Sequence, residues 1–130
     1  MGSKFMWRLW LAAAFAAAAI SCSKSDSGTS PSTPPTATTT ITITSGGVTP
    51  KNIVISRGSR VTFVNNDSRA HDMESDPHPE HTDCPEINSV GVLNAGQNRQ
   101  TGNLNTARTC GFHDHIDFGN NNLKGSILIQ

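Results

Sequence analysis

The histidines and cysteines of this chain are concentrated in one stretch, and their spacing points to metal chemistry. All five histidines lie between residues 71 and 115, at His71, His78, His81, His113 and His115. Cys110 and His113 are three residues apart, so one tight loop could aim both at a common point, with His71 supplied from a distant strand. Two imidazoles and one thiolate are the trigonal ligand set of a blue copper site. The sequence therefore predicts one copper ion (Cu+/Cu2+) per chain, held by these three residues.

Cys84 leaves a second interpretation open. Disulfides persist in exported proteins, and two cysteines in a small exported domain are commonly bonded to each other. A bond from Cys84 to Cys110 would remove the thiolate and leave a copper binder that relies on histidines. The pattern of His71 with Cys110 and His113 favours the thiolate site, and the disulfide form is kept as the alternative.

Other residues of the stretch are candidates for additional roles. His115 and Met73 are possible additional or axial ligands, since Met occurs only at positions 1, 6 and 73 and none follows Cys110. His78, His81 and Cys84 are spaced three apart and could hold a second metal on one helical turn. The prolines between residues 76 and 90 oppose such a turn, so a polar loop that covers the copper is the favoured interpretation.

Short strands must position these residues. Residues 40–44 alternate Thr and Ile, and residues 52–56 alternate again, as strands with one buried face do. Residues 61–64 form a third candidate strand, and residues 107–110 and 126–130 are later ones. Three prolines in residues 76–90 predict a loop or at most one helical turn. Short strands separated by Gly and Asn turns predict an all-β sandwich or barrel.

The beginning of the chain predicts export. Residues 1–22 combine a basic start with an apolar run that is too short to span a bilayer, as in a signal peptide. Ala19-Ile20-Ser21-Cys22 resembles a bacterial lipobox, which implies lipidation of Cys22 and a membrane anchor in the cell envelope, either periplasmic or on the cell surface. Residues 23–39, rich in Ser, Thr and Pro, predict a disordered tether. Residues 40–130 remain for one domain.

Charge excludes one class of partner and suggests another. Without Lys4 and Arg8 of the signal, eight basic residues face ten acidic ones, so nucleic-acid binding is not expected. Six acidic residues fall within residues 72–86, a segment without Lys or Arg. They form either a solvated loop or a surface that attracts cations or a basic partner.

Two segments resemble a known family. Val61-Thr62-Phe63-Val64-Asn65-Asn66-Asp67, leading into His71, resembles the first half of the metal site of plastocyanin/azurin-type cupredoxins. Cys110-Gly111-Phe112-His113, followed by Lys124-Gly125-Ser126-Ile127-Leu128-Ile129, resembles the second half. The resemblance covers roughly residues 40–130 and implies a Greek-key β-sandwich with one copper. It further implies a monomer that exchanges electrons with exported redox proteins in transient contacts. The chain departs from the family in lacking the axial Met.

Three classes of function compete. Electron transfer at a type 1-like copper site is the leading prediction. A non-redox copper carrier, sensor or sink on the same scaffold, with the disulfide, is the alternative. An enzyme is not expected: His113-Asp114-His115 superficially resembles the His-x-His segment of copper/zinc superoxide dismutase, but no further His or Cys follows to complete such a site.

Overall fold

The computed structural model describes residues 34–130. The predicted export signal, the lipidation site Cys22 and most of the predicted tether lie outside these residues. No helix among the described residues is both long enough and apolar enough to cross a membrane.

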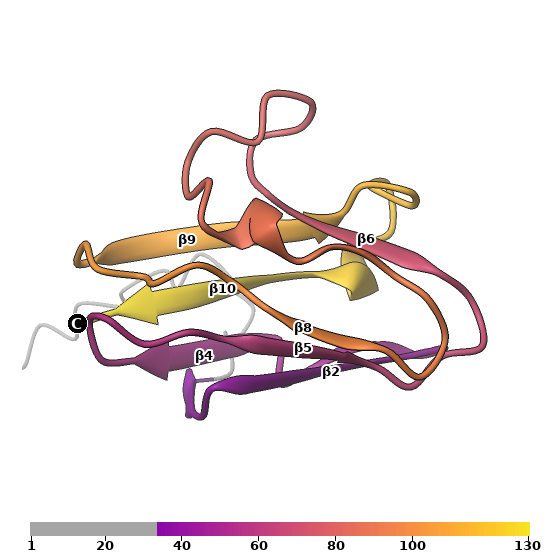
Figure 1. Cartoon of the computed structure of the whole chain (residues 1–130), viewed down its shortest axis with the longest axis horizontal. Helices are drawn as coiled ribbons and strands as arrows, with labels where there is room; N and C mark the ends of the chain where they lie inside the picture. Colours follow the sequence, from indigo (N-terminus) through magenta and orange to yellow (C-terminus); the bar gives the residue numbers. More distant parts are fainter. Residues whose placement is uncertain (1–33) are drawn as a thin grey trace, which may run out of the picture. The chain divides into compact units, whose positions relative to one another are not determined.

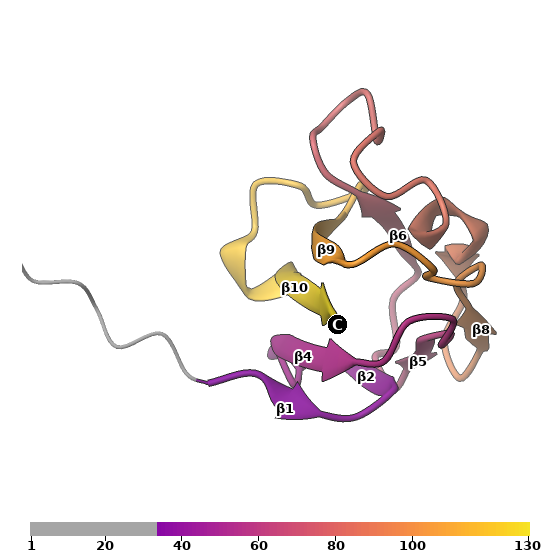
Figure 2. The same cartoon turned by 90° about the vertical axis from the view of Figure 1, so that its left-hand side faces the viewer.

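Short strands form two sheets that pack face to face (Figures 1 and 2). The six-stranded sheet has the order β1-β4-β10-β9-β6-β7 and consists of β1 (Thr36–Ala37), β4 (Asn52–Ile55), β10 (Lys124–Ile129), β9 (Arg108–Asp114), β6 (His71–Ser75) and β7 (Gly91–Leu93). The four-stranded sheet has the order β3-β2-β5-β8 and consists of β3 (Gly47–Thr49), β2 (Thr40–Thr44), β5 (Thr62–Asn65) and β8 (Asn98–Gln100). Two 3-10 turns, η1 (Ile87–Ser89) and η2 (Asn121–Leu123), lie in the connections.

The core lies between the two sheets, because alternate residues of each strand point inward. Ile41 and Ile43 of β2 are fully buried, and the Thr residues between and beside them are not. Phe63 of β5 meets Phe112 of β9 edge to face, with ring centroids 5.2 Å apart. This contact joins the sheets and identifies the side of β9 that faces the core.

The all-β sandwich expected from the sequence is confirmed, with differences at particular strands. Strand β2 has the predicted bounds, and β4, β5 and β10 shift by one or two residues. Strand β9 continues past the predicted end at residue 110 as far as Asp114. Strand β6 was not predicted, and β1 lies within the residues assigned to the tether, where it pairs in parallel with β4.

Strands β6 and β9 are antiparallel neighbours that present most of the candidate residues. Their register places Met73 opposite Asp114 and Glu74 opposite His113. The chain leaves β6 at Ser75 and forms the segment that we call the covering loop, residues 76–86, before η1. In Figure 1 this loop rises above β6 and β9 on the side away from the other sheet.

Candidate metal centre

The faces of β9 decide which candidate ligands can meet. Cys110 and Phe112 point toward the other sheet, as the contact between Phe112 and Phe63 shows. Residues one or three positions away along a strand point to the opposite face. His113 therefore lies on the outer face of the sheet, beneath the covering loop, and cannot share a site with Cys110.

Four histidines meet on this outer face. His113 lies near the end of β9 and His115 directly follows that strand, and His78 and His81 come from the covering loop. One ring nitrogen of each lies within 4.8 Å of the corresponding nitrogen of the other three. Nδ1 of His115 and Nε2 of His81 are 3.2 Å apart. We call these four residues the histidine cluster.

Two ring nitrogens of the cluster are buried without a hydrogen-bond partner: Nε2 of His113 and Nδ1 of His78. The other nitrogen of His113, Nδ1, donates to Oδ1 of Asp76 at 2.6 Å. This bond leaves Nε2 with its lone pair aimed into the cluster. A carboxylate behind a histidine in this way fixes the tautomer and orients the ring in metal sites. Unpartnered buried nitrogens are otherwise rare because leaving them so is costly.

Gly111 makes room for Asp76. Gly111 lies two residues before His113, on the same face of β9, and its carbonyl accepts from the backbone N–H of Asp76 at 3.1 Å. A Cβ at this position would overlap Oδ2 of Asp76 and lie 2.9 Å from its Cγ. The absent side chain thus lets the Asp76 carboxylate lie over the strand and reach His113.

The surroundings of two rings of the cluster, His78 and His81, favour the neutral imidazole, the form that binds metals. Burial lowers the pKa of His78, and the neighbouring His115 and His113 lower it further. The pKa of His81 is lowered by the same causes, burial first and then the other rings. On the adjacent strand, burial and the nearby Asp72 raise the pKa of Glu74. Two of the rings are thus ready to accept a metal ion near neutral pH.

Cys110 is bonded to Cys84 in a disulfide whose two residues are fully buried. The predicted Cys110 thiolate ligand is therefore wrong for this structure, and the alternative disulfide is found. The bond ties the end of the covering loop, which carries His78 and His81, to the strand that carries His113. A type 1 copper ion, which requires a thiolate, does not fit this set of residues.

His71 lies apart from the cluster and has a different role. Its partner on β9 is Asp114, which lies four residues, or about 13 Å of strand, beyond Cys110. Its Nδ1 pairs with Oδ2 of Asp114 at 2.7 Å, and its Nε2 pairs with Oδ2 of Asp67 at 3.1 Å. All three side chains are buried. Both ring nitrogens are thus already occupied, and the structure does not place His71 as a ligand.

The carboxylates of Asp67 and Asp114, which both contact His71, hold the backbone next to the histidine cluster in place. Burial tends to raise the pKa of Asp67, but hydrogen bonds from His71, Ser68 and Arg69 outweigh it and leave that pKa lowered. Asp114 accepts the backbone N–H groups of Asp72 and Ile116 at 2.9 and 3.1 Å. Because Asp114 lies between His113 and His115, this network fixes the backbone that presents both.

The other candidate ligands lie on opposite faces of the six-stranded sheet. Met73, a possible axial ligand, is fully buried on the inner face of β6, away from the cluster. His115, the other possible ligand, is in the cluster. His78 and His81 were expected to form a second metal site with Cys84 or a polar loop over the first. They belong instead to the same cluster as His113 and His115.

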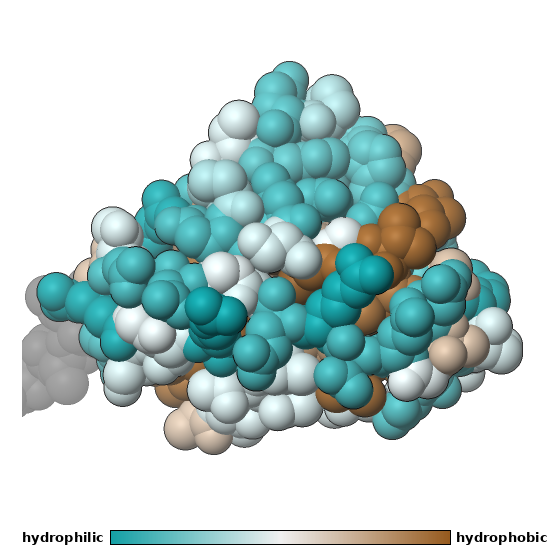
Figure 3. Space-filling view, viewed as in Figure 1, coloured by the Kyte–Doolittle hydropathy of each residue, from teal (hydrophilic) through white to brown (hydrophobic). Residues whose placement is uncertain are grey.

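An exposed apolar rim adjoins the cluster. The Phe118 ring stacks on His78, with centroids 4.1 Å apart and planes 6° from parallel. Ile116 and Phe118 are 59% and 50% exposed. In Figure 3 an apolar patch lies over the connection between β9 and β10, beside the hydrophilic covering loop. The rim shields one side of His78 from water.

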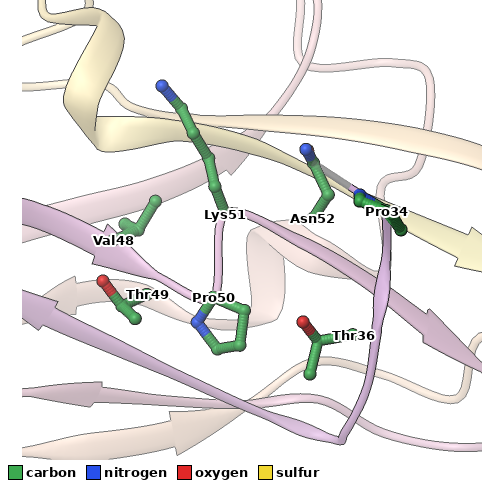
Figure 4. Close-up of a pocket in the computed structure, with 7 residues that line it drawn as sticks. All are labelled: Pro34, Thr36, Val48, Thr49, Pro50, Lys51 and Asn52. Carbon is green, nitrogen blue, oxygen red and sulfur yellow. The ribbon is translucent and has the colours of Figure 1, made fainter. Parts of the chain in front are cut away.

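A pocket of about 410 Å³ lies elsewhere, between β1, β3 and β4 (Figure 4). Its walls include Pro34, Val48, Pro50 and Lys51. Lys51 is the one ionisable residue of its lining, and none of the four histidines borders it. This pocket offers no ligand set for a metal, so the cluster is the candidate functional site.

Comparisons with known proteins agree on the fold. No family model and no curated protein matches the chain. Among solved structures, a purple cupredoxin from Nitrosopumilus maritimus is 18% identical, with a TM-score of 0.56 over 72% of this chain and 100% of that one. Plastocyanin from Dryopteris crassirhizoma is 16% identical, with a TM-score of 0.55 over 70% and 99%. A reduced amicyanin mutant is 12% identical, with a TM-score of 0.57 over 70% and 80%.

The residues 34–130 therefore have the cupredoxin fold, as the two sequence segments around His71 and Cys110 implied. At these identities the likeness defines the fold alone. The candidate metal centre differs in its ligands from the thiolate site that the resemblance implied, because it consists of four histidines.

Proposed function

We propose that this protein binds one copper ion through His78, His81, His113 and His115 and serves as a copper carrier or sink. The observation that carries the proposal is that two ring nitrogens within a group of four imidazoles, Nδ1 of His78 and Nε2 of His113, are buried and have no hydrogen-bond partner. Copper would satisfy these nitrogens and cross-link the covering loop to β9.

Copper is favoured over other metals on two grounds. Imidazole ligands suit copper and zinc, and divalent copper binds nitrogen sites more tightly than the other first-row divalent ions. The fold is also shared with cupredoxins, among them an amicyanin structure described as its Cu(I) form. Zinc, which accepts four histidines tetrahedrally, is the competitor to exclude.

Electron transfer is the second candidate function. The fold shared with plastocyanin and amicyanin supports it. It would proceed through copper bound to four imidazoles, in transient contacts with exported redox proteins near the rim of Ile116 and Phe118. We favour binding and storage because the disulfide leaves Cys110 without a thiolate to give the blue site.

The cellular setting of the proposal is the envelope of a bacterium. The export signal and the lipobox-like Ala19-Ile20-Ser21-Cys22 support a lipoprotein anchored through Cys22, with the copper site held outside the cytoplasm. Mass spectrometry of the membrane fraction tests this: the mature protein should begin at Cys22 and carry acyl chains. A soluble product cleaved elsewhere contradicts the anchor.

The direct test is titration of the mature protein with Cu(II). We expect one copper per chain, nitrogen hyperfine structure in its electron paramagnetic resonance spectrum, and a weak visible spectrum without the intense thiolate band. The double variant His113→Gln/His115→Gln should lose this copper. Asn98→Ala, an exposed change on β8 in the other sheet, should keep it. Binding that survives the double variant, or an intense band near roughly 600 nm that indicates a thiolate ligand, contradicts the proposal.

A further inference from the structure

The outer face of β6 presents acidic residues alongside the cluster. Asp72 and Glu74 alternate along the strand on the same face, and Asp76 follows at its end. Glu74 is opposite His113, and the backbone N–H of His115 donates to the carbonyl of Asp72 at 2.7 Å. Directly opposed residues on one face have Cβ atoms about 5 Å apart. A column of carboxylates thus runs beside the column of imidazoles.

These carboxylates are only partly neutralised. Asp76 bonds to His113, whereas Oδ1 of Asp72 is buried with no hydrogen-bond partner. Within residues 34–130, no Lys or Arg forms an ion pair with Asp72 or Glu74. One cation faces the cluster from the other side, because Lys124 of β10 is opposite His113. The carboxylates of Asp72, Glu74 and Asp76, with Glu80 of the covering loop beside His78, therefore outnumber the one ammonium around the cluster.

The carboxylates around the cluster favour a metal ion of higher charge over one of lower charge. Neutral imidazoles contribute no net charge, so the carboxylates set the local potential, and a divalent ion gains twice what a monovalent ion gains. Sulfur ligands, which select Cu(I), are absent from the cluster among the described residues. Met73 lies on the inner face, and both cysteines of this region form the disulfide.

We propose, on the basis of the metal binding proposed above, that the cluster selects the divalent state of copper over Cu(I), and that Asp72 and Glu74 provide this selectivity. The site then has a reduction potential below that of the aqueous copper couple. It receives and delivers copper as Cu(II), in contrast to a site that cycles between both states.

The test measures both affinities on the mature protein. Cu(II) affinity is determined by competition with an aminocarboxylate chelator, and Cu(I) affinity by competition with a bicinchoninate under anaerobic conditions. We expect the wild type to bind Cu(II) more tightly than Cu(I). Asp72→Asn/Glu74→Gln should lower the ratio of the two affinities by about twentyfold or more, mainly through weaker Cu(II) binding. Each tenfold loss raises the potential by about 59 mV.

Two further variants make the result specific. Asp83→Asn removes an exposed carboxylate of the covering loop that is not on β6, and it should leave the ratio within about threefold of the wild type. Lys124→Gln removes the facing cation and should change the ratio in the opposite direction, in favour of Cu(II). The direction of this change can be measured even if the Asp72→Asn/Glu74→Gln variant does not fold.

The outcomes separate the two proposals. Tighter binding of Cu(I) than of Cu(II) by the wild type overturns the selectivity and leaves the copper site intact. An unchanged ratio in a folded, copper-binding Asp72→Asn/Glu74→Gln variant overturns the role of these two carboxylates. Binding of neither ion overturns the proposed function itself, and the selectivity with it.

Discussion

Gly111→Ala should weaken metal binding although Gly111 is not a ligand. The new Cβ would overlap Oδ2 of Asp76, so the carboxylate must move away from β9. The Asp76 side chain is 43% exposed and can swing into water. Its 2.6 Å hydrogen bond to Nδ1 of His113 is then lost. His113 keeps its place in the strand but loses the group that fixes its tautomer and orientation.

The magnitude follows from that lost bond. Loss of a carboxylate behind a metal-binding histidine typically reduces metal affinity by about 10- to 100-fold. In free energy this is about 1.4 to 2.8 kcal/mol of binding. Folding should be affected less, because Ala is tolerated in a strand and Asp76 retains contact with water. The expected signature is therefore a large change in metal affinity with a small change in unfolding free energy.

The assay compares Cu(II) affinity in Gly111→Ala, Asp76→Asn and the double variant, with urea unfolding as the check on folding. Since both single changes remove the same hydrogen bond, their effects should not add. Gly119→Ala is the matched control, because a Cβ there meets nothing within 4 Å. Full additivity, or wild-type affinity in folded Gly111→Ala, refutes the reasoning that Gly111 acts through Asp76.

Three other predictions follow from the site and its supports. Cys84→Ala/Cys110→Ala opens a link across 26 residues and should lower the free energy of unfolding by about 3.5 kcal/mol in urea; an unchanged midpoint contradicts it. His71→Leu removes one hydrogen-bond partner from each of two buried carboxylates, Asp67 and Asp114, and should cost about 2–4 kcal/mol of stability. Copper stoichiometry by elemental analysis of the folded variant should stay at one; loss of the copper would make His71 a ligand. Because the pKa values of His78 and His81 are lowered on folding from 6.5, the unfolded chain binds more protons, so stability without metal should be greatest above pH 6.5 and fall as pH drops through it. Urea unfolding at pH 7.5 and 5.5 should show this decline, and His78→Gln/His81→Gln should reduce it; a more stable acidic form contradicts the prediction.

The strands with an alternating apolar pattern could be predicted from the sequence. Residues 40–44 alternate Thr and Ile, and the strand that forms has those bounds because Ile41 and Ile43 fill the core. Strand β6 could not be found in this way. Its inward residues are His71, Met73 and Ser75, of which only Met73 is apolar. Buried and exposed residues therefore alternate along this strand, but apolar and polar residues do not.

The ligand set was only partly predictable for a related reason. The spacing of Cys110 and His113 was interpreted as one tight loop, on which both could face the same point. The strand in fact continues to Asp114, so a separation of three residues places them on opposite faces. His113 and His115 are two apart and keep one face, and this spacing was the available signal. The approach of His78 and His81 to them depends on a loop path that local patterns do not encode.

The position of the cluster on the outer face of the sheet has a kinetic consequence. No residue between Asp76 and Cys84 is fully buried, whereas the core and the disulfide lie on the other side of β9. Lifting this segment would free two of the four ligands at once without exposing the hydrophobic core. Local opening of this kind needs much less free energy than global unfolding. The exchange rate of a bound metal ion would therefore be set by local opening of this segment and not by global unfolding. A stable fold can in this way hold a metal ion that exchanges rapidly.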